Sequence, residues 1–305
     1  MKVTSSHSST AFNIIAHRGI SIYEAPENTI LALKRALEGG FLIETDVQKA
    51  KDCYPLIHDN YILGLGDENL SQGRTKIETH YGNGFYFQDY RKPVSECTLN
   101  DLLTKTIFNK ARLEAALSKR AGEPVYLELT EPPKIATLTN LIELLKKFPQ
   151  SKVFLEIKRP DIYATYSDGM EEEIIGIICD NGLLENIIIN SSNVSTLKNI
   201  RKANSHITIS IDTDYADIPD LTHNMDEAKR MRDEIGISFW NPPFYEVDKK
   251  LLDDIEKLDL EAASWVQNET KKEELSEIRR LKSIGLRYLF TDQAEEALKI
   301  YMARI

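Results

Sequence analysis

The chain has 305 residues, of which 42% are hydrophobic and 28% are charged, a composition typical of a globular protein with a sizeable core. Its 38 basic and 48 acidic side chains give a formal net charge of −10. This balance argues against nucleic acid as a partner, because binding a phosphate backbone requires a basic face. An anionic substrate would need a locally positive site, formed by a metal ion or by a few lysines and arginines.

The sequence contains no clear motif for disulfide bonds, for a signal peptide or for a membrane span. Cys53, Cys97 and Cys179 are scattered and lack metal-ligand spacing, so we expect no disulfide framework and a reducing compartment. The N-terminal stretch MKVTSSHSST lacks the apolar core of a signal peptide, and no apolar run is long enough to span a membrane. We therefore expect a cytoplasmic protein without stable membrane insertion. The sequence carries no signal for the oligomeric state.

Short apolar runs rich in β-branched residues alternate with segments of helical periodicity. Near-continuous apolar runs are typical of strands that are covered on both faces. The predicted strands occupy residues 13–17, 41–47, 152–158, 186–190, 206–211, 236–240, 260–265 and 286–290. The predicted helices occupy residues 27–38, 134–147, 169–181, 194–203, 224–234, 247–258, 270–283 and 293–303. Eight such units predict a single (β/α)₈ TIM barrel over residues 1–305, rather than an open doubly wound sheet.

The stretch 59–133 interrupts this alternation. It contains GLGDENLSQG, the aromatic-rich HYGNGFYFQDY and a strand-like VYLEL at 125–129. We expect a small insertion or cap after the second strand. Its aromatic side chains are interpreted either as a lid or contact surface, or as the insertion's own core. These aromatic residues are Tyr81, Phe85, Tyr86, Phe87 and Tyr90.

Three carboxylates stand inside apolar runs near predicted strand ends, where TIM barrels carry their reacting groups. Glu44 and Asp46 are two residues apart, so both point to one face of their strand, and Glu156 ends the next barrel strand. Converging carboxylates repel one another unless a cation neutralises them. Oxygen ligands of this kind suit one divalent ion, Ca²⁺ or Mg²⁺. The alternative for Glu44 and Asp46 is an edge-strand pair or a salt-bridged pair.

Histidines and cations accompany these carboxylates. His17 ends the first strand and His58 lies in PLIHD, so one imidazole could accept a proton while the other donates one near neutral pH. Arg18 and Lys158 could clamp an anionic, phosphoryl group, or Lys158 could only neutralise a neighbouring carboxylate. Trp265 ends the seventh strand and is interpreted as pocket wall or as core.

In this order and spacing, the motifs resemble the glycerophosphodiester phosphodiesterase family. The matching stretches are IIAHRG…APENT (14–29), IETDV (43–47), PLIHD (55–59), FLEIK (154–158), SWVQN (264–268) and LFTD (289–292). The resemblance implies a (β/α)₈ barrel with a small insertion and one divalent metal, Ca²⁺ or Mg²⁺. It implies metal ligands at Glu44, Asp46 and Glu156, an acid–base pair at His17 and His58, phosphate contacts at Arg18 and Lys158, and Trp265 in the pocket wall.

Members of this family split a phosphodiester into an alcohol and a phosphomonoester, often sn-glycerol 3-phosphate. The resemblance therefore implies that the substrate is a small glycerophosphodiester, with the metal holding a phosphate oxygen and the two histidines serving as acid and base. Two alternatives stay open: a phospholipase D-like lyase that releases a cyclic phosphate, and a non-catalytic barrel that acts as a binding protein. The stretch 59–133 does not align with the family, so the leaving-group alcohol is the least constrained part.

Overall fold

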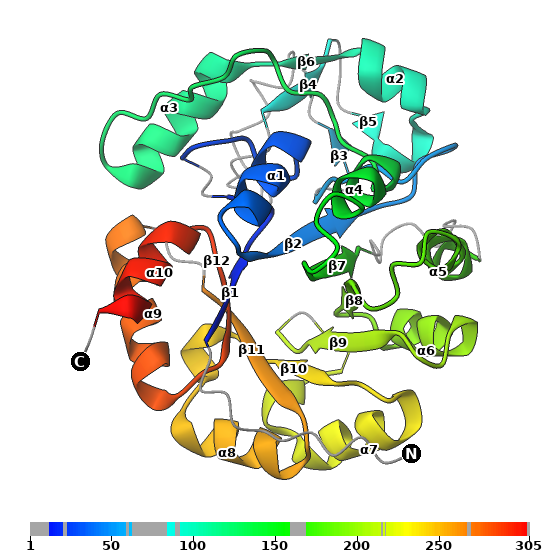
Figure 1. Cartoon of the computed structure of the whole chain (residues 1–305), viewed down its shortest axis with the longest axis vertical. Coiled ribbons are helices and arrows are strands. Elements are labelled where there is room, and N and C mark those ends of the chain that lie inside the picture. Colours follow the sequence, from blue (N-terminus) through cyan, green and yellow to red (C-terminus); the bar gives the residue numbers. More distant parts are fainter. Residues whose placement is uncertain are drawn as a thin grey trace.

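The computed structural model describes residues 12–20, 23–58, 61–62, 84–88, 92–158, 169–214, 216, 218–266 and 270–303. Within them, eight parallel strands close into a barrel with the order β1-β12-β11-β10-β9-β8-β7-β2 (Figure 1). The barrel strands are β1 (Asn13–Ala16), β2 (Leu42–Val47), β7 (Val153–Ile157), β8 (Ile187–Ser191), β9 (Thr208–Asp212), β10 (Phe239–Asn241), β11 (Glu261–Val266) and β12 (Tyr288–Thr291). The predicted TIM barrel is confirmed.

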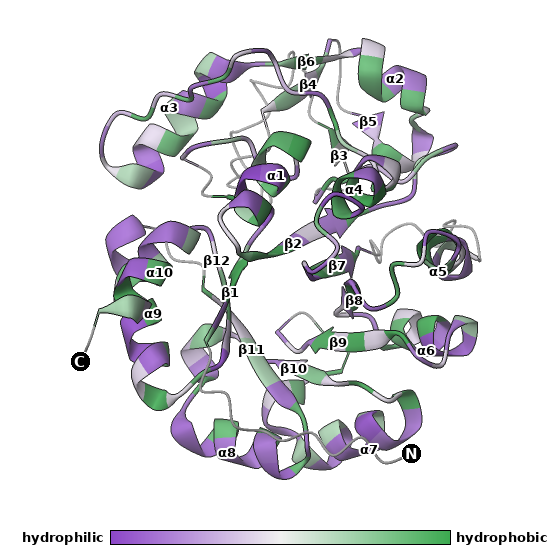
Figure 2. Ribbon diagram, in the orientation of Figure 1, coloured by the Kyte–Doolittle hydropathy of each residue, from purple (hydrophilic) through white to green (hydrophobic). Residues whose placement is uncertain are grey.

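Helices surround this barrel and bury their apolar faces against it. Figure 2 shows hydrophilic residues along the outward sides of these helices and hydrophobic residues toward the strands. The helices that follow the barrel strands or precede the next one are α1 (Ile30–Glu38), α4 (Leu138–Leu145), α5 (Met170–Asp180), α6 (Val194–Ala203), α7 (Met225–Ile235), α8 (Lys249–Lys257), α9 (Lys271–Ile284) and α10 (Ala294–Met302). Short 3₁₀ turns, η4 (Leu221–His223) and η5 (Phe244–Glu246), precede α7 and α8.

A second, smaller core fills the inside of the barrel. The ring of Phe154 meets those of Phe239 and Phe290 edge-on, with centroid distances of 5.2 and 5.0 Å. Ile15 and Ile188 belong to the same cluster. Because alternate strand residues share a face, the residues two positions later on these strands belong at the carboxyl-terminal mouth. Those residues are His17, Glu156, Asn190, Asn241 and Asp292.

We call the chain between β2 and α4 the insertion (residues 48–137); its described residues lie outside the barrel sheet. It forms two antiparallel pairs, β3 with β5 and β4 with β6, and lies along the upper side of the view in Figure 1. The two ends of the insertion meet, because Pro55 and Thr137 form an isolated bridge. Its elements are β3 (Tyr61–Ile62), β4 (Phe85–Phe87), β5 (Lys92–Pro93), η3 (Val94–Glu96), α2 (Leu99–Thr104), β6 (Thr106–Phe108) and α3 (Lys110–Ala121).

The aromatic residues of β4 belong to the core of the insertion rather than to an exposed surface. Phe85 and Phe87 pack with Val94 and Leu102 in a separate hydrophobic cluster, and Tyr86 is also buried. The predicted cluster members at 81 and 90 lie outside the described residues. The interpretation as a small core is therefore supported for β4.

The strand predicted at 125–129 is wrong. Val125 and Leu127 do alternate inward, against α3, while Tyr126 between them is 76% exposed. Their backbone N–H groups, however, donate to side chains of α3, at 2.8 Å to Ser118 Oγ and 2.6 Å to Glu114 Oε1. Side-chain acceptors on the helix thus replace the neighbouring strand that a ladder would need.

Two further expectations concern the chain as a whole. All three cysteines lie within the described residues and are free, in agreement with the predicted lack of disulfides. Among the helices of the described chain, none combines the length and the apolar character needed to cross a bilayer.

Candidate active site

Three carboxylates meet at the mouth ends of β2 and β7. Asp46 and Glu156 are register partners on these adjacent strands, and Glu44 lies two residues before Asp46 on the same face. One oxygen of each carboxylate lies within 4.8 Å of the others. Glu44 and Asp46 are almost completely buried. The three predicted metal ligands are therefore close enough to contact one ion.

The electrostatics of this cluster favour an added cation. Burial, together with the neighbouring Asp46 and Glu156, raises the pKa of Glu44 well above its ordinary value. The Oε1 atom of Glu44 is buried and finds no hydrogen-bond partner among the described residues. Arg18 and Lys158 place two positive charges beside these three carboxylates. Three hard oxygen donors with incomplete charge compensation fit a divalent ion such as Ca²⁺ or Mg²⁺.

The two predicted phosphate contacts border the same carboxylates. Arg18 Nε lies 2.9 Å from Asp46 Oδ2, and Arg18 Nη1 donates to Glu27 Oε2 at 3.0 Å. Lys158 Nζ lies 3.3 Å from Asp46 Oδ1 and also bonds to Glu156. Burial disfavours the charged ammonium, but these acidic neighbours raise the pKa of Lys158 above its ordinary value. Both side chains therefore keep their positive charge at the mouth.

Asn28, in the APENT stretch, holds Asp46 in place. Its amide donates to Asp46 Oδ2 at 3.0 Å, while its Oδ1 accepts from Thr45 Oγ1 at 2.7 Å. Asn28 has a φ of 55°, in the left-handed region that asparagine tolerates better than most residues. The next residue, Thr29, caps α1 by accepting from Ala32 N. The APENT stretch therefore has two functions: it caps the start of α1, and it orients Asp46, a candidate metal ligand.

His17 is held by a carboxylate that follows β12. His17 Nδ1 lies 2.7 Å from Asp292 Oδ1, and His17 Nε2 lies 3.8 Å from Glu44 Oε2. Burial opposes ionisation of Asp292, but His17 and Arg120 keep the pKa of this carboxyl well below its usual range. An ionised carboxylate only accepts, so Nδ1 of His17 carries a proton; in the neutral ring, Nε2 then presents a lone pair.

His58 carries the opposite arrangement of protons. Its Nδ1 lies 2.6 Å from Arg18 Nη2 and 3.2 Å from Asp46 Oδ1. A guanidinium cannot accept a hydrogen bond, so in this shorter contact Nδ1 is the acceptor and the neutral ring carries its proton on Nε2; the longer approach to Asp46 is then not a hydrogen bond. Burial, Arg18 and Lys158 lower the pKa of His58 well below its ordinary value, which keeps the ring neutral. Gln48 fixes the backbone by donating to the His58 carbonyl at 2.8 Å.

The structure brings all eight predicted site residues to this one end of the barrel. The ring of Trp265 belongs partly to the barrel core and lies 5.4 Å from the ring of His17. Sequence reasoning assigned no role to Asn28, Arg120, Asp212 or Asp292. Asp212 ends β9, where burial and Glu156 raise its pKa to about 7. A polar residue at the end of an apolar run is the signal that marks both Asp212 and Asp292.

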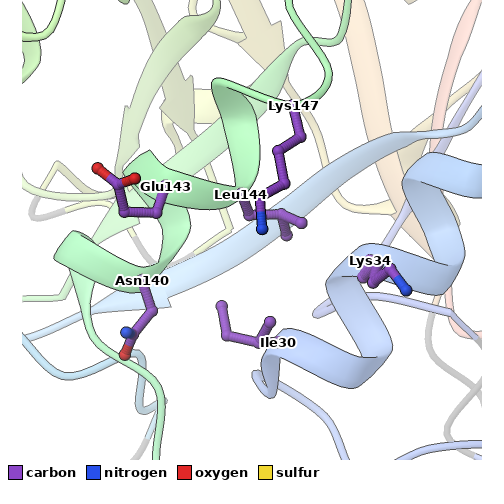
Figure 3. Close-up of a pocket in the computed structure, with 6 residues that line it drawn as sticks. All are labelled: Ile30, Lys34, Asn140, Glu143, Leu144 and Lys147. Carbon is purple, nitrogen blue, oxygen red and sulfur yellow. The ribbon is translucent and has the colours of Figure 1, made fainter.

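A separate groove lies on the outer layer, between α1 and α4 (Figure 3). It carries none of the predicted site residues and lies between two helices rather than at the strand ends. Its lining residues are Ile30, Lys34, Asn140, Glu143, Leu144 and Lys147.

The sequence profile of the Glycerophosphoryl diester phosphodiesterase family matches residues 17–296. The chain belongs to this family. A curated member, the glycerophosphodiester phosphodiesterase of Caldanaerobacter subterraneus subsp. tengcongensis, is 31% identical over 204 residues. That match covers 65% of this chain, and the chain spans 65% of the length of that relative.

Solved structures of the family share the fold. A candidate glycerophosphoryl diester phosphodiesterase from Silicibacter pomeroyi is similar with a TM-score of 0.76 and 16% identity, covering 97% of this chain and 94% of its own. A phosphodiesterase from Oleispira antarctica, in complex with the product sn-glycerol-3-phosphate, has a TM-score of 0.65 and 18% identity. It covers 95% of this chain and 97% of its own. At these identities the likeness is one of architecture.

Proposed function

We propose that the protein is a metal-dependent glycerophosphodiester phosphodiesterase that produces an alcohol and sn-glycerol 3-phosphate. The observation that carries the proposal is the pairing of the carboxylate cluster with two histidines that hold their protons on different nitrogens. Membership of the family supports it. The product seen in the Oleispira antarctica phosphodiesterase also supports a small glycerol phosphate ligand for this fold.

Glu44, Asp46 and Glu156 would hold one divalent ion, Ca²⁺ or Mg²⁺. When bound, such an ion polarises a phosphate oxygen and offsets the charge that develops on it. Arg18 and Lys158 border the carboxylates and would contact the phosphate from the protein side. Trp265, beside His17, would form part of the wall along the substrate.

The inferred proton positions of the neutral rings support different roles for the two histidines. His17 presents its Nε2 lone pair, with Asp292 behind it, and would accept the proton of the attacking hydroxyl as that oxygen bonds to phosphorus. His58 carries a proton on Nε2 and would give it to the alkoxide as the phosphorus–oxygen bond to the alcohol breaks. The attacking hydroxyl belongs either to water or to the glycerol moiety of the substrate; in the second case a cyclic phosphate forms, and water then opens it.

Phosphorus NMR of the purified protein with defined diesters tests this proposal. The substrates are glycerophosphocholine, glycerophosphoethanolamine and glycerophosphoinositol, each with Ca²⁺, Mg²⁺ or chelator. Metal-dependent appearance of glycerol 3-phosphate supports the proposal and identifies the leaving group. A stable cyclic phosphate would make the protein a lyase, and no turnover of any diester by folded, metal-loaded protein would favour a binding protein.

Replacing either histidine separates catalysis from folding. We expect His17→Ala and His58→Ala each to lower kcat by at least about 100-fold, because each removes a proton-transfer group. Circular dichroism and thermal unfolding should stay close to those of the wild type. His223→Ala is the matched control, since that side chain is exposed and pairs with Glu246. Near-wild-type turnover in either catalytic variant would contradict the acid–base assignment.

A further inference from the structure

Helix α3 of the insertion delivers a buried arginine to the back of the active site. Arg120 Nη1 donates to Asp292 Oδ2 at 2.8 Å, and the other oxygen of that carboxylate receives His17 Nδ1 at 2.7 Å. One carboxylate therefore joins a residue of the insertion to the candidate base. Arg120 and His17 come from different parts of the fold, α3 and the end of β1.

The place of Arg120 on its helix is unusual. Leu113 and Leu117 are buried on the inner face of α3, and position 120 continues that face at helical spacing. An apolar residue is expected there, yet the structure buries an arginine that is only 5% exposed. Burying a guanidinium costs free energy unless its partners compensate for the lost water. Those partners are the acidic side chains Asp292 and Glu274 of the barrel rather than groups of the insertion itself.

A second acidic side chain completes the arrangement. Glu274 of α9 is buried, and its Oε2 lies 3.7 Å from Arg120 Nη2. Its Oε1 accepts from Thr291 Oγ1 at 2.7 Å and from Asp292 N at 3.1 Å, which fixes the backbone of Asp292. The side chain of Asp292 is thus held from two sides and its backbone from a third. A carboxylate with both oxygens engaged cannot rotate away from His17.

We propose that Arg120 is a positioning residue for catalysis: by holding the second oxygen of Asp292, it keeps the other oxygen on His17 Nδ1, so that Nε2 stays a lone pair facing the carboxylate cluster. This rests on the proposed phosphodiesterase function. It makes full turnover depend on the docking of α3, so the insertion contributes to the chemistry.

Steady-state kinetics of Arg120→Met tests the assignment. Methionine fits the apolar face of α3 but has no donor for Asp292. We expect kcat to fall by about 10–100-fold, a magnitude typical of residues that orient an active-site group, with KM and metal affinity changed by less than about three-fold. Lys119→Met is the matched control, because Lys119 is the exposed neighbour on the same helix with the same charge. It should retain wild-type kcat.

Two additional variants keep the test decisive. Arg120→Lys retains a charge and one donor, so it should keep more of kcat than Arg120→Met, and it carries the test if Arg120→Met fails to fold. In a variant that already carries Asp292→Asn, Arg120→Met should lower kcat only a little further, because both changes break the same chain of contacts from Arg120 through Asp292 to His17. Wild-type kcat in Arg120→Met, or losses that simply add in the double variant, would overturn the proposal.

A readout independent of turnover separates this proposal from the proposed function. The His17 Nδ1 proton, bonded to Asp292, should give a low-field proton NMR signal that is absent from His17→Gln. We expect this signal to broaden or disappear in Arg120→Met and to persist in Lys119→Met. An unchanged signal in Arg120→Met would refute the positioning role of Arg120, even if the protein turns over no diester. If the wild type is inactive on every diester, that result alone would refute only the proposed phosphodiesterase function.

Discussion

Asn28 contacts Asp46 through its amide while its carbonyl oxygen binds the β2 backbone and Thr45. We expect Asn28→Ala to weaken Ca²⁺ or Mg²⁺ binding by about 10–100-fold, because a ligand that loses its orienting partner binds less well. Isothermal titration calorimetry measures this. Asn193→Ala is the control: it removes the cap of α6 and costs about 1 kcal/mol of stability without touching the site. Equal metal affinity in both variants would refute the role of Asn28.

At the residue scale, the sequence predicts the members of the site better than their contacts. Residue types and spacing place the predicted ligands and histidines at strand ends. The period of two along a strand can be read from the local sequence, and the barrel topology brings the carboxyl ends of its strands together. The partner of His17 is 275 residues away at Asp292, and no local pattern pairs the two. Arg120 is still harder to find, since its only signal is an arginine at an apolar position of a helix.

Gly19 allows α1 to pack directly against the turn that carries His17 and Arg18. Its φ is 108°, and a Cβ there would lie 2.6 Å from the Cβ of Ala32 in α1. We expect Gly19→Ala to lower the free energy of unfolding by about 2–4 kcal/mol through strain and overpacking. Gly40→Ala is the matched control, also at positive φ but with open space around it, and should cost about 1–2 kcal/mol. Urea unfolding compares the two, and equal losses would contradict the packing argument.

Glu274 connects α9 to the end of β12 and gives the protein a pH-dependent element. Burial and the nearby Asp292 raise its pKa to about 8, against the contributions of Thr291 and Arg120. A raised pKa means that its stabilising contribution is complete below the unfolded value near 4.5 and is lost as pH rises through about 8. The wild type should therefore lose stability relative to Glu274→Gln between pH 5 and 8, by at most about 1.4 kcal/mol per pH unit. Urea unfolding at several pH values measures this. The prediction is contradicted if the free energies of unfolding of the wild type and Glu274→Gln change with pH in the same way.

At the element scale, the barrel follows from the sequence and the insertion does not. Continuous apolar runs such as the one in β8 identify strands without knowledge of their neighbours. Residues 125–129 carry the same alternation, but their donors meet side chains of α3, a partner that depends on tertiary packing. Whether a segment of the insertion forms a strand is thus decided by its contacts with other segments, and the local periodicity of the sequence does not predict these contacts.

For the whole molecule, the carboxylate cluster predicts that stability depends on the metal. An ion that binds only the folded chain should raise the free energy of unfolding by about 2.7 kcal/mol at 100 times its Kd. Urea unfolding with CaCl₂ or MgCl₂ against chelator measures this, and Glu156→Gln should reduce the gain. Glu143→Gln, an exposed acid on α4, is the control and should keep the full gain. An identical midpoint with and without either metal would refute the metal site.

The bridge between Pro55 and Thr137 closes the insertion at its base, so we expect a change in the length of the chain between them to leave the barrel strands in place. Two residues inside it cannot be exchanged so freely. His58 follows directly after this base, and Arg120 lies near the end of α3. The span between these two points is residues 59–119. A chimera that transplants a relative's insertion across that span retains both anchors.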